Sequence, residues 1–387
     1  DENTPSAVGT AIDWQNLSVG QNHTCGIRTD GSLYCWGYNR SGQLGNGTIR
    51  VDEKKTLVPS TARSDWKEMT VAHLHTCGIT LDGALYCWGG NDHGQLGDGT
   101  TTIRDNPVRV GNTSDWNMIA ARYHHTCGIK GTGDLYCWGL NADGQLGDGT
   151  TIDKYSPTRI GMDNDWQLVS TGSTSTCGIR AGGKMYCWNK FSLTPKVIGI
   201  DSDWLSIDVG YSHACAVKTD GSLYCMGANH LGQLGDGTIQ DKTEFVHIIS
   251  GSDWQTISVG GEHTCGIRAG GELYCWGSNL SYQLGNGMIQ NEITPIRISG
   301  ANDWQVVAAG SFMTCGVRAE GKLYCWGDGY PTPTRRNAES AWSVVDVEET
   351  HRCAIKTSGS LYCAGYNNVG QLGIGNDTLA PEKVLNP

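Results

Sequence analysis

Short apolar runs alternate with glycine, asparagine and aspartate along this chain, in a pattern that repeats eight times. The clearest unit contains four such runs, at residues 254–260, 263–268, 273–277 and 294–298. Each run contains β-branched or aromatic residues, and no segment has a convincing helical period, so we predict a β-strand at each run. Four antiparallel strands in about 50 residues, repeated along a chain, are typical of the blades of a β-propeller.

A tryptophan begins each unit. Successive tryptophans are separated by 50 or 52 residues, except for two intervals of 38 residues. We therefore predict a single all-β domain over residues 1–387, a β-propeller of eight four-stranded antiparallel blades. The repeats begin near Trp14, Trp66, Trp116, Trp166, Trp204, Trp254, Trp304 and Trp342.

Every unit also contains two cysteines that are ten positions apart. The turn between them, as at residues 29–31, fits a three-residue hairpin loop with glycine in the left-handed conformation. This register places a tyrosine opposite a small residue, as in Tyr34 and Gly26, and it places the two cysteines opposite each other. Opposed Cα atoms about 4.5 Å apart suit a disulfide. One intra-blade disulfide per repeat is predicted, between Cys25 and Cys35, Cys77 and Cys87, Cys127 and Cys137, Cys177 and Cys187, Cys215 and Cys225, Cys265 and Cys275, Cys315 and Cys325, and Cys353 and Cys363.

Both ends of the chain contain a segment that looks like the last strand of a unit, at residues 4–8 and 380–384. Only one of them can occupy that position in the blade that begins at Trp14. Because a closed ring of blades leaves no exposed strand edge, we expect one terminus to pair across the seam and the other to be surplus.

The recurring sequence resembles the regulator of chromosome condensation repeat. In the sixth unit the resemblance rests on His263–Ile267, Leu273–Gly277 and Gln283–Gly285. It extends over essentially the whole chain and implies a β-propeller, for which seven blades are usual in that family and are therefore the alternative to eight. The chain departs from the family in its eighth unit, in its cysteine pairs and in lacking a basic tail. The family's founding member acts on a small GTPase in the nucleus. We do not carry over that role, because disulfides belong to oxidising compartments.

Composition places the protein outside the cell. All sixteen cysteines fall into pairs, and the chain begins at Asp1 without a signal-peptide pattern, which we interpret as a mature secreted chain. The net charge of −11 disfavours a nucleic-acid partner. No apolar run approaches the length of about 18 residues that a membrane span requires.

Six histidines occupy the position two residues before the first cysteine of a unit, and a ring of histidines could bind a metal. The two units that lack this histidine have Ser175 and Met313 instead, and they also lack the Gln-Leu-Gly loop. We therefore favour a structural role, in which each histidine forms a hydrogen bond with its own long loop or its neighbour's. The six are His23, His75, His125, His213, His263 and His351.

Two further recurring features are also predicted to be structural. Gly-Asp-Gly-Thr at residues 97–100, 147–150 and 235–238 suggests a calcium or phosphate site, but one aspartate per loop is too few oxygen ligands, so a tight turn is favoured. A tryptophan series could stack on sugars, but Met226 and Ala364 interrupt it, so packing between blades is favoured. The series is Trp36, Trp88, Trp138, Trp188, Trp276 and Trp326.

Candidate glycosylation sites follow from the Asn-x-Ser/Thr pattern of a secreted glycoprotein. They are Asn16, Asn22, Asn39, Asn46, Asn112, Asn279 and Asn376.

No catalytic constellation stands apart from the repeat, so we predict neither an enzyme nor a cofactor or metal. The leading hypothesis is a secreted, extracellular propeller that binds a protein partner. The alternatives are a carbohydrate-binding or cell-surface structural protein and, less favoured, an extracellular enzyme. Two units are twelve residues short, and these notches contain the candidate partner-binding residues Phe191, Tyr330, Arg335 and Arg336. The alternative is that the two loops were lost without consequence.

Overall fold

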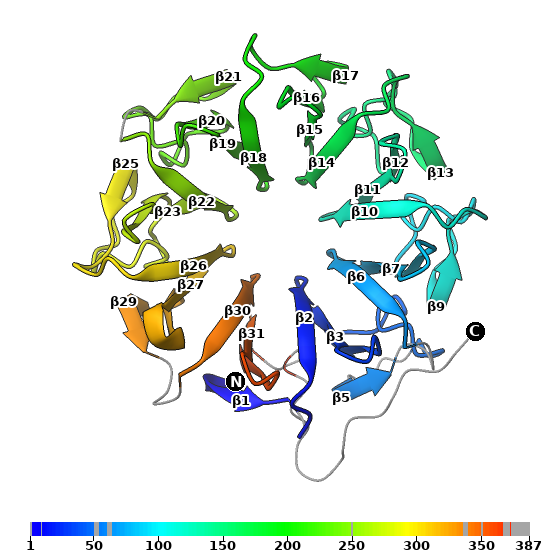
Figure 1. Cartoon of the computed structure of the whole chain (residues 1–387), viewed down its shortest axis with the longest axis horizontal. Helices are drawn as coiled ribbons and strands as arrows, with labels where there is room; N and C mark the ends of the chain where they lie inside the picture. The colour runs from blue at the N-terminus through cyan, green and yellow to red at the C-terminus, as the bar shows by residue number, and fades with distance from the viewer. Residues whose placement is uncertain are drawn as a thin grey trace. The chain divides into compact units, whose positions relative to one another are not determined.

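The computed structural model describes residues 2–8, 10–49, 54–59, 64–248, 251–335, 340–349, 351–366 and 372, with backbone alone at residues 2–7 and 54–59. These residues form eight four-stranded antiparallel sheets and one 3-10 turn, η1 (Ala319–Gly321), without an α-helix (Figure 1). The fold is an all-β propeller with eight blades, as predicted, and the alternative of seven blades is wrong.

Each blade is built from four successive positions. The first strands are β2 (Trp14–Val19), β6 (Trp66–Val71), β10 (Trp116–Ala121), β14 (Trp166–Thr171), β18 (Trp204–Val209), β22 (Trp254–Val259), β26 (Trp304–Ala309) and β30 (Trp342–Val347). The second strands are β3 (His23–Arg28), β7 (His75–Thr80), β11 (His125–Lys130), β15 (Thr176–Arg180), β19 (His213–Lys218), β23 (His263–Arg268), β27 (Met313–Arg318) and β31 (His351–Lys356). The third strands are β4 (Leu33–Gly37), β8 (Leu85–Gly89), β12 (Leu135–Gly139), β16 (Met185–Asn189), β20 (Leu223–Gly227), β24 (Leu273–Gly277), β28 (Lys322–Gly327) and β32 (Leu361–Gly365). The fourth strands are β5 (Lys54–Pro59), β9 (Arg104–Arg109), β13 (Lys154–Arg159), β17 (Ser192–Val197), β21 (Lys242–His247), β25 (Glu292–Arg297), β29 (Tyr330–Arg335) and β1 (Glu2–Ala7).

We number the blades 1 to 8 by their first strands, so that blade 1 contains β2 and blade 8 contains β30. Blade 8 takes its fourth strand from the other end of the chain, since β1 pairs antiparallel with β32. The prediction that a terminal segment would complete the blade of Trp14 is therefore wrong. Blade 1 already has its own fourth strand, β5, and it is blade 8 that receives the terminal strand. The C-terminal segment 380–384 lies outside the described residues.

The hairpin of the second and third strands follows the predicted register. In blade 1, Cys25 lies opposite Cys35 and Gly26 opposite Tyr34, and Gly31 in the turn has a φ of 77°. All eight predicted disulfides are present, each within one blade and with Cα atoms 4.1 Å apart. The chain contains no free cysteine.

The tryptophan of the first strand explains the small residue opposite each tyrosine. A Cβ atom at Gly26 would lie 2.7 Å from the Trp14 ring, so the indole leaves room for only a small residue there. The equivalent residue is alanine in blades 5 and 8, at Ala216 and Ala354. Trp14 also meets Tyr34 edge to face, with the ring centroids 5.5 Å apart. Similar contacts recur between Trp66 and Tyr86 in blade 2 and in blades 3, 5, 6 and 7, so these blades share one aromatic arrangement.

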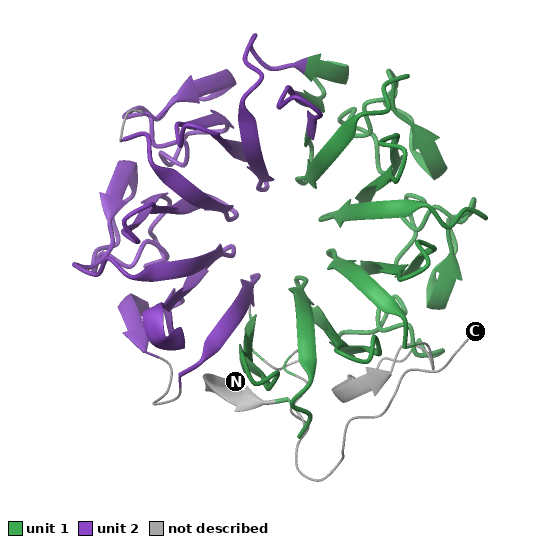
Figure 2. Ribbon diagram, viewed as in Figure 1, with its two compact units in different colours: residues 1–178, 187–196, 350–387 green, residues 179–186, 197–349 purple. Residues whose placement is uncertain are grey.

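The chain divides into two compact units (Figure 2). Unit 1 contains residues 1–178, 187–196 and 350–387, and unit 2 contains residues 179–186 and 197–349. One division lies within blade 4 and the other within blade 8, between β30 and β31. In blades 4 and 7, residues 190–191 and 328–329 replace the long connection between the third and fourth strands. Within the part of the chain that the structure describes, no helix is long and apolar enough to cross a membrane.

Candidate binding surface and the buried network beneath it

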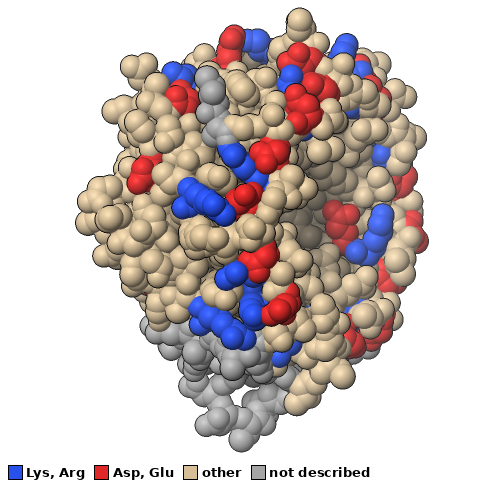
Figure 3. All heavy atoms as spheres, turned by 60° about the vertical axis from the view of Figure 1, so that its left-hand side comes forward, with Lys and Arg blue, Asp and Glu red and all other residues tan. Residues whose placement is uncertain are grey.

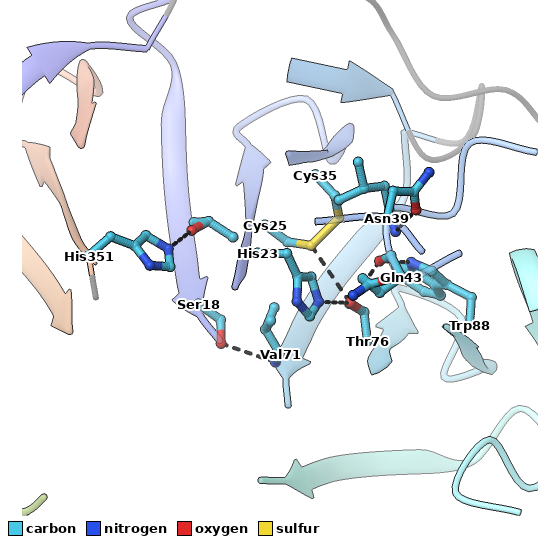
Figure 4. The surroundings of a disulfide bond; sticks show 12 residues. Ser18, His23, Cys25, Cys35, Asn39, Gln43, Val71, Thr76, Trp88 and His351 are labelled. Carbon is cyan, nitrogen blue, oxygen red and sulfur yellow. Dashed lines mark hydrogen bonds between the residues drawn. A yellow bond between two sulfur atoms is a disulfide. The ribbon is translucent and has the colours of Figure 1, made fainter. Parts of the chain in front are cut away.

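A buried histidine connects neighbouring blades at six places. In blade 1, His23 Nε2 lies 2.8 Å from Thr76 Oγ1 on the second strand of blade 2 (Figure 4). Thr76 Oγ1 donates at 3.2 Å to the carbonyl of Gln43, in the long connection of blade 1. We call this path from histidine to threonine to loop carbonyl a relay. The pairs are His351–Thr24, His23–Thr76, His75–Thr126, His125–Thr176, His213–Thr264 and His263–Thr314.

The relay corrects the sequence prediction in one respect. The histidine does not bond directly to a long loop, because a threonine of the next blade lies between them. Five threonines donate to a loop carbonyl over 2.8–3.2 Å. The accepting carbonyls belong to Gln43, Gln95, Gln145, Gln233 and Gln283.

The tryptophan that follows the second cysteine packs beneath the same loop. Trp88 Nε1 donates to the Gln43 carbonyl at 2.9 Å, and a Cβ atom at Gly45 would lie 2.7 Å from that nitrogen. The predicted packing of this series between blades is confirmed. All six indoles are fully buried, so none offers a face on which a sugar could stack: Trp36, Trp88, Trp138, Trp188, Trp276 and Trp326.

Blades 4 and 7 lack the relay, and its loss is visible in the blade that follows each of them. Both blades have lost the histidine and the long connection. In the next blade, Ala214 or Arg352 stands where other repeats have the threonine, and Met226 or Ala364 replaces the tryptophan. Four features that span two repeats are therefore lost together, which accounts for the two interruptions of the tryptophan series.

The Gly-Asp-Gly-Thr segments form turns, as predicted. Asp236 Oδ1 accepts hydrogen bonds from the Thr238 amide at 2.9 Å and from Asn229 Nδ2 at 3.0 Å, and Lys242 Nζ lies 3.2 Å from Oδ2. Burial alone would raise the pKa of Asp236, but hydrogen bonds from Thr238, Lys242 and Asn229 together lower it below its usual value. Within the described residues, no group of three histidine, cysteine, aspartate or glutamate side chains is arranged to hold a metal.

The residue six positions after this aspartate carries the opposite charge. Asp98, Asp148 and Asp236 pair with Arg104, Lys154 and Lys242. Where the sequence has Asn286 instead, the residue six positions later is Glu292, and Asn286 Nδ2 donates to its carboxylate at 3.2 Å. The two positions therefore form one matched pair in each of these loops.

Exchanging one member of a pair is expected to destabilise the protein. Asn286→Asp places a second carboxylate beside Glu292 and should lower the free energy of unfolding by about 1 kcal/mol. Adding Glu292→Lys recreates the pair of blades 2, 3 and 5 and should recover that loss. Urea unfolding of the two single variants and the double variant measures the coupling. If Glu292→Lys changes the free energy of unfolding equally in the wild-type chain and in the Asn286→Asp variant, the two side chains do not interact.

Three of the candidate glycosylation sites are incompatible with a glycan in the folded chain. Asn39, Asn46 and Asn279 are buried, and the side-chain amide of Asn279 donates to Asn286 Oδ1 and the Met288 carbonyl at 2.9 and 2.8 Å. These asparagines shape the long connections instead. Asn112 is exposed, Asn16 and Asn22 are half-buried, and Asn376 lies outside the described residues.

The predicted partner-binding residues lie on the short connections and strands of blades 4 and 7. Phe191 is 77% exposed in the tight turn between β16 and β17, with Lys190 Nζ 5.2 Å from its ring centroid. Tyr330 and Arg335 lie at opposite ends of β29. Arg336 lies outside the described residues.

Unit 1 contains a cluster of aromatic and imidazole rings that the sequence interpretation missed. The His73 ring stacks on Tyr123, with centroids 5.0 Å apart and planes 3° apart. His124 meets both rings edge to face, at 5.3 and 4.5 Å, and the His93 ring lies 5.4 Å from His124. We call His73, His93, Tyr123 and His124 the imidazole cluster.

Two kinds of connection bring these rings together. His73, Tyr123 and His124 come from the loops between the first and second strands of blades 2 and 3, where the His73 amide donates to the Arg122 carbonyl at 2.9 Å. His93 comes from the long connection of blade 2, and its Nδ1 lies 2.9 Å from Asp153 Oδ2. The surface therefore extends across two neighbouring blades.

The surroundings of the cluster keep its central imidazole neutral. Burial is the main cause that lowers the pKa of His124 to about 4, and the nearby His73 and His93 lower it further. Tyr123 is 37% exposed, and the side chain of His93 is 36% exposed. The cluster is thus a partly exposed aromatic surface whose central imidazole, His124, is uncharged at neutral pH. Aromatic side chains of this kind are frequent at protein interfaces.

Length differences between repeats gave no indication of this surface. The loops at residues 72–74 and 122–124 are as long as their counterparts at 172–174 and 260–262, and they differ only in composition. A position-by-position comparison of these loops would have found the aromatic and imidazole residues.

The equivalent loops of unit 2 have different chemistry. The Tyr211 hydroxyl lies 3.0 Å from Ser311 Oγ and 3.2 Å from Glu349 Oε1. Phe312 is 51% exposed beside Ser311. The loops between the first and second strands therefore carry imidazoles in blades 2 and 3, and a tyrosine, a phenylalanine and carboxylates in blades of unit 2. Such differences are typical of variable binding loops on a uniform scaffold.

Comparison with known proteins identifies the repeat. A model of the regulator of chromosome condensation (RCC1) repeat matches residues 30–79, 82–129, 132–179, 220–267 and 270–317. A second RCC1 repeat model matches residues 14–43, 204–233, 254–283 and 305–330. These matches cover more than half of the chain, so the protein belongs to the RCC1 repeat family.

Similar curated proteins share only part of their length with this chain. The ultraviolet-B receptor UVR8 of Arabidopsis thaliana is 32% identical over 94 residues, which are 24% of this chain and 21% of the receptor. The E3 ubiquitin-protein ligase HERC2 of Homo sapiens is 31% identical over 94 residues, which are 24% of this chain and 2% of the ligase. The matched segment thus spans about a fifth or less of these relatives.

Solved structures share the fold at low sequence identity. Prp20p of Saccharomyces cerevisiae superposes with a TM-score of 0.66 at 18% identity, over 95% of this chain and 98% of Prp20p. Human WBSCR16 gives a TM-score of 0.64 at 18% identity, over 80% of this chain and 87% of that chain. The structures of Prp20 concern its binding to Gsp1p and histones and its complex with Kap60, so propellers of this type bind proteins.

Proposed function

We propose that this chain is a secreted, non-enzymatic propeller that binds a protein partner through the imidazole cluster of unit 1. The observation that carries the proposal is the set of partly exposed rings of His73, His93, Tyr123 and His124, which contact one another across two blades. Aromatic side chains held in place by their neighbours are frequent energetic centres of protein interfaces, because little side-chain entropy is lost on binding.

The disulfides support a location outside the cell. All eight are within single blades, and both sulfurs of the blade 1 bond belong to fully buried residues. Such bonds persist in oxidising compartments and are rare in the cytosol.

The charged surface supports a protein partner over a nucleic acid. On the side of the molecule drawn in Figure 3, lysine and arginine side chains lie beside aspartate and glutamate. Ion pairs such as Lys218 Nζ–Asp201 Oδ2, at 2.7 Å, are examples of this mixing. A mixed surface with a net charge of −11 differs from the extended basic footprint that binds phosphate backbones.

Replacing Tyr123 by alanine is expected to weaken partner binding about 30-fold, since loss of a central aromatic side chain costs about 2 kcal/mol. The immobilised chain is used to capture its partner from the extracellular fluid of the source organism. The captured protein is then purified, and its affinity for the wild-type and variant chains is measured by calorimetry.

Phe191→Ala and Tyr330→Ala provide the matched controls, because Phe191 lies in the short connection of blade 4 and Tyr330 directly follows the short connection of blade 7. The proposal expects wild-type affinity from both controls. Weakened binding in the controls, with unchanged binding in Tyr123→Ala, would place the site at the notches instead.

A further inference from the structure

The relay geometry requires a neutral imidazole. The Thr76 hydroxyl has one proton, which it donates to the Gln43 carbonyl, so it must accept from His23 Nε2–H. The other ring nitrogen, Nδ1, then carries a lone pair. A second proton at that nitrogen would need an acceptor and would add a charge in the core.

The same arrangement recurs around the remaining relay histidines. Within the part of the chain that the structure describes, Nδ1 is buried without a hydrogen-bond partner in five of the six rings. These five rings are also fully buried. They belong to His23, His75, His125, His263 and His351.

The charged and titratable groups that face these rings oppose protonation as well. His73 and His351 act on His23, Arg352 acts on His351, and His124 acts on both His75 and His125. His75 is also affected by His23, His125 and His73. Each of these groups would repel a positive charge on the ring that it faces.

Burial is the largest cause of the resulting shifts. It lowers the pKa to about 3 for four rings and well below the usual value for His75. The four rings are His23, His125, His263 and His351.

We propose that the relays form an acid-responsive device, in which the buried imidazoles accept a second proton only when the contacts between neighbouring blades within each unit open. Acid therefore favours the open state and releases the loops that those contacts hold. The proposal rests on the histidine–threonine contact shared by the six pairs, on the loop carbonyl that accepts from the threonine in five of them, and on the position of the loops next to them. It does not depend on the identity of a partner.

The imidazole cluster lies directly on relay strands. Its loops at residues 72–74 and 122–124 end at His75 and His125, the first residues of β7 and β11. The carbonyls of Leu74 and His124 accept from the amides of Gly90 and Leu140, which begin the long connections of blades 2 and 3. Opening a relay therefore removes the support of the candidate binding surface. Release of a partner in acid, unlike the device itself, rests on the proposed function.

The sign of the pH dependence follows from the lowered pKa values. The ordinary pKa of histidine is about 6.5 in the unfolded chain, so between that value and about 3 the unfolded chain binds a proton that the folded chain excludes. The stabilising contribution is complete above pH 6.5 and is lost as the pH falls. Each of these five rings should raise the equilibrium constant for unfolding about tenfold for every pH unit below about 6.5.

The direct test counts the protons that the full chain takes up on unfolding in denaturant at pH 5, with its disulfides intact. The variant is His263→Ser with Thr314→Ala, which copies the residues found beside the short blade 4, Ser175 and Ala214. Potentiometry should show about one proton less for this variant than for the wild-type chain. His230→Gln is the control, because this exposed ring lies outside the relays and should leave the count unchanged.

A second measurement follows the loops. Hydrogen exchange, corrected for its intrinsic pH dependence, should rise at residues 72–74 and 122–124 between pH 7 and pH 5. The equivalent loop at residues 172–174, which precedes Ser175 instead of a histidine, should change less. If the double variant does not fold, His263→Asn gives the same proton count.

Equal proton uptake by the wild-type chain and the relay variant would overturn the proposal, and so would unchanged exchange in the two loops. Neither result depends on partner binding. A failure of the proposed function, with Tyr123→Ala binding normally, would leave the proton count as expected, so the two failures are distinguishable.

Discussion

Complete reduction of the eight disulfides is expected to unfold the protein. Each bond closes a hairpin of ten-residue separation, and in the chain-entropy model such a bond contributes about 2.5–3 kcal/mol. Eight bonds together exceed the net stability of about 5–15 kcal/mol that is typical of a folded domain. Far-ultraviolet circular dichroism with and without a reductant measures the effect. Titration of sixteen free thiols per chain shows that reduction is complete.

A single bond provides the scale for this prediction. Cys265→Ala with Cys275→Ala should lower the free energy of unfolding by about 2.5–3 kcal/mol and leave the other seven bonds intact. Peptide mapping without reductant checks the pairing. A fully reduced chain that keeps its native circular dichroism spectrum would contradict the expectation, as would a bond between Cys35 and Cys77 in the native protein.

Replacing Trp138 by alanine should have an effect of similar size, a loss of about 3–5 kcal/mol in the free energy of unfolding. The indole is fully buried beneath Gly97 of the preceding blade, and its Nε1 donates to the Gln95 carbonyl at 2.9 Å. Truncation leaves a cavity and removes one of the two donors to that carbonyl, the other being Thr126 Oγ1. Chemical unfolding followed by fluorescence of the remaining tryptophans measures the loss.

Met226→Ala is the matched control, because Met226 occupies the same position after a blade that has no long connection. Met226 is only half-buried. Its truncation should cost less than about 2 kcal/mol. Equal losses in the two variants would show that packing under the preceding loop does not stabilise the tryptophan.

The sequence was sufficient to predict the strands and the disulfides because both depend on local geometry. The ten-residue spacing of Cys25 and Cys35 and the glycine in the turn determine the register of one hairpin, whose two strands are adjacent in the chain. Each blade repeats this information, so eight copies support the same prediction. The long connections are similarly local, since Asp236 and Thr238 form their own turn.

Interactions between repeats were harder to predict. His23 and Thr76 are 53 residues apart, and the sequence interpretation paired the histidine with a long loop of its own or the neighbouring unit instead of a threonine on the next unit's second strand. The signal was present in the following unit, where Ala214 and Met226 mark the missing loop. The position of β1 was predicted in the wrong blade for a related reason. No repeat precedes this strand in the chain, so the sequence pattern alone does not indicate whether it belongs to blade 1 or to blade 8.

The imidazole cluster could not be found from the repeat pattern alone. Function was expected where loops differ in length, and this expectation led to Phe191 and Tyr330. His73 and His124 lie in loops of constant length, and their proximity depends on how adjacent blades pack. Distances between side chains on different repeats depend on how the blades pack against each other, and the repeat period of the sequence does not determine this packing.

Each complete relay joins two sheets, since its histidine and loop belong to one sheet and its threonine belongs to the next. This arrangement has a consequence for recombining the repeats. A segment cut at the sheet boundaries, such as residues 204–247, contains His213 and the Gln233 loop but neither Thr264 nor Trp276, which cover them in the next sheet. The transferable segment with a complete relay runs instead from His213 to Trp276. A chimeric propeller with an additional long loop therefore has to be joined within the sheets, at the second strand, so that each loop is inherited together with the threonine and tryptophan beneath it.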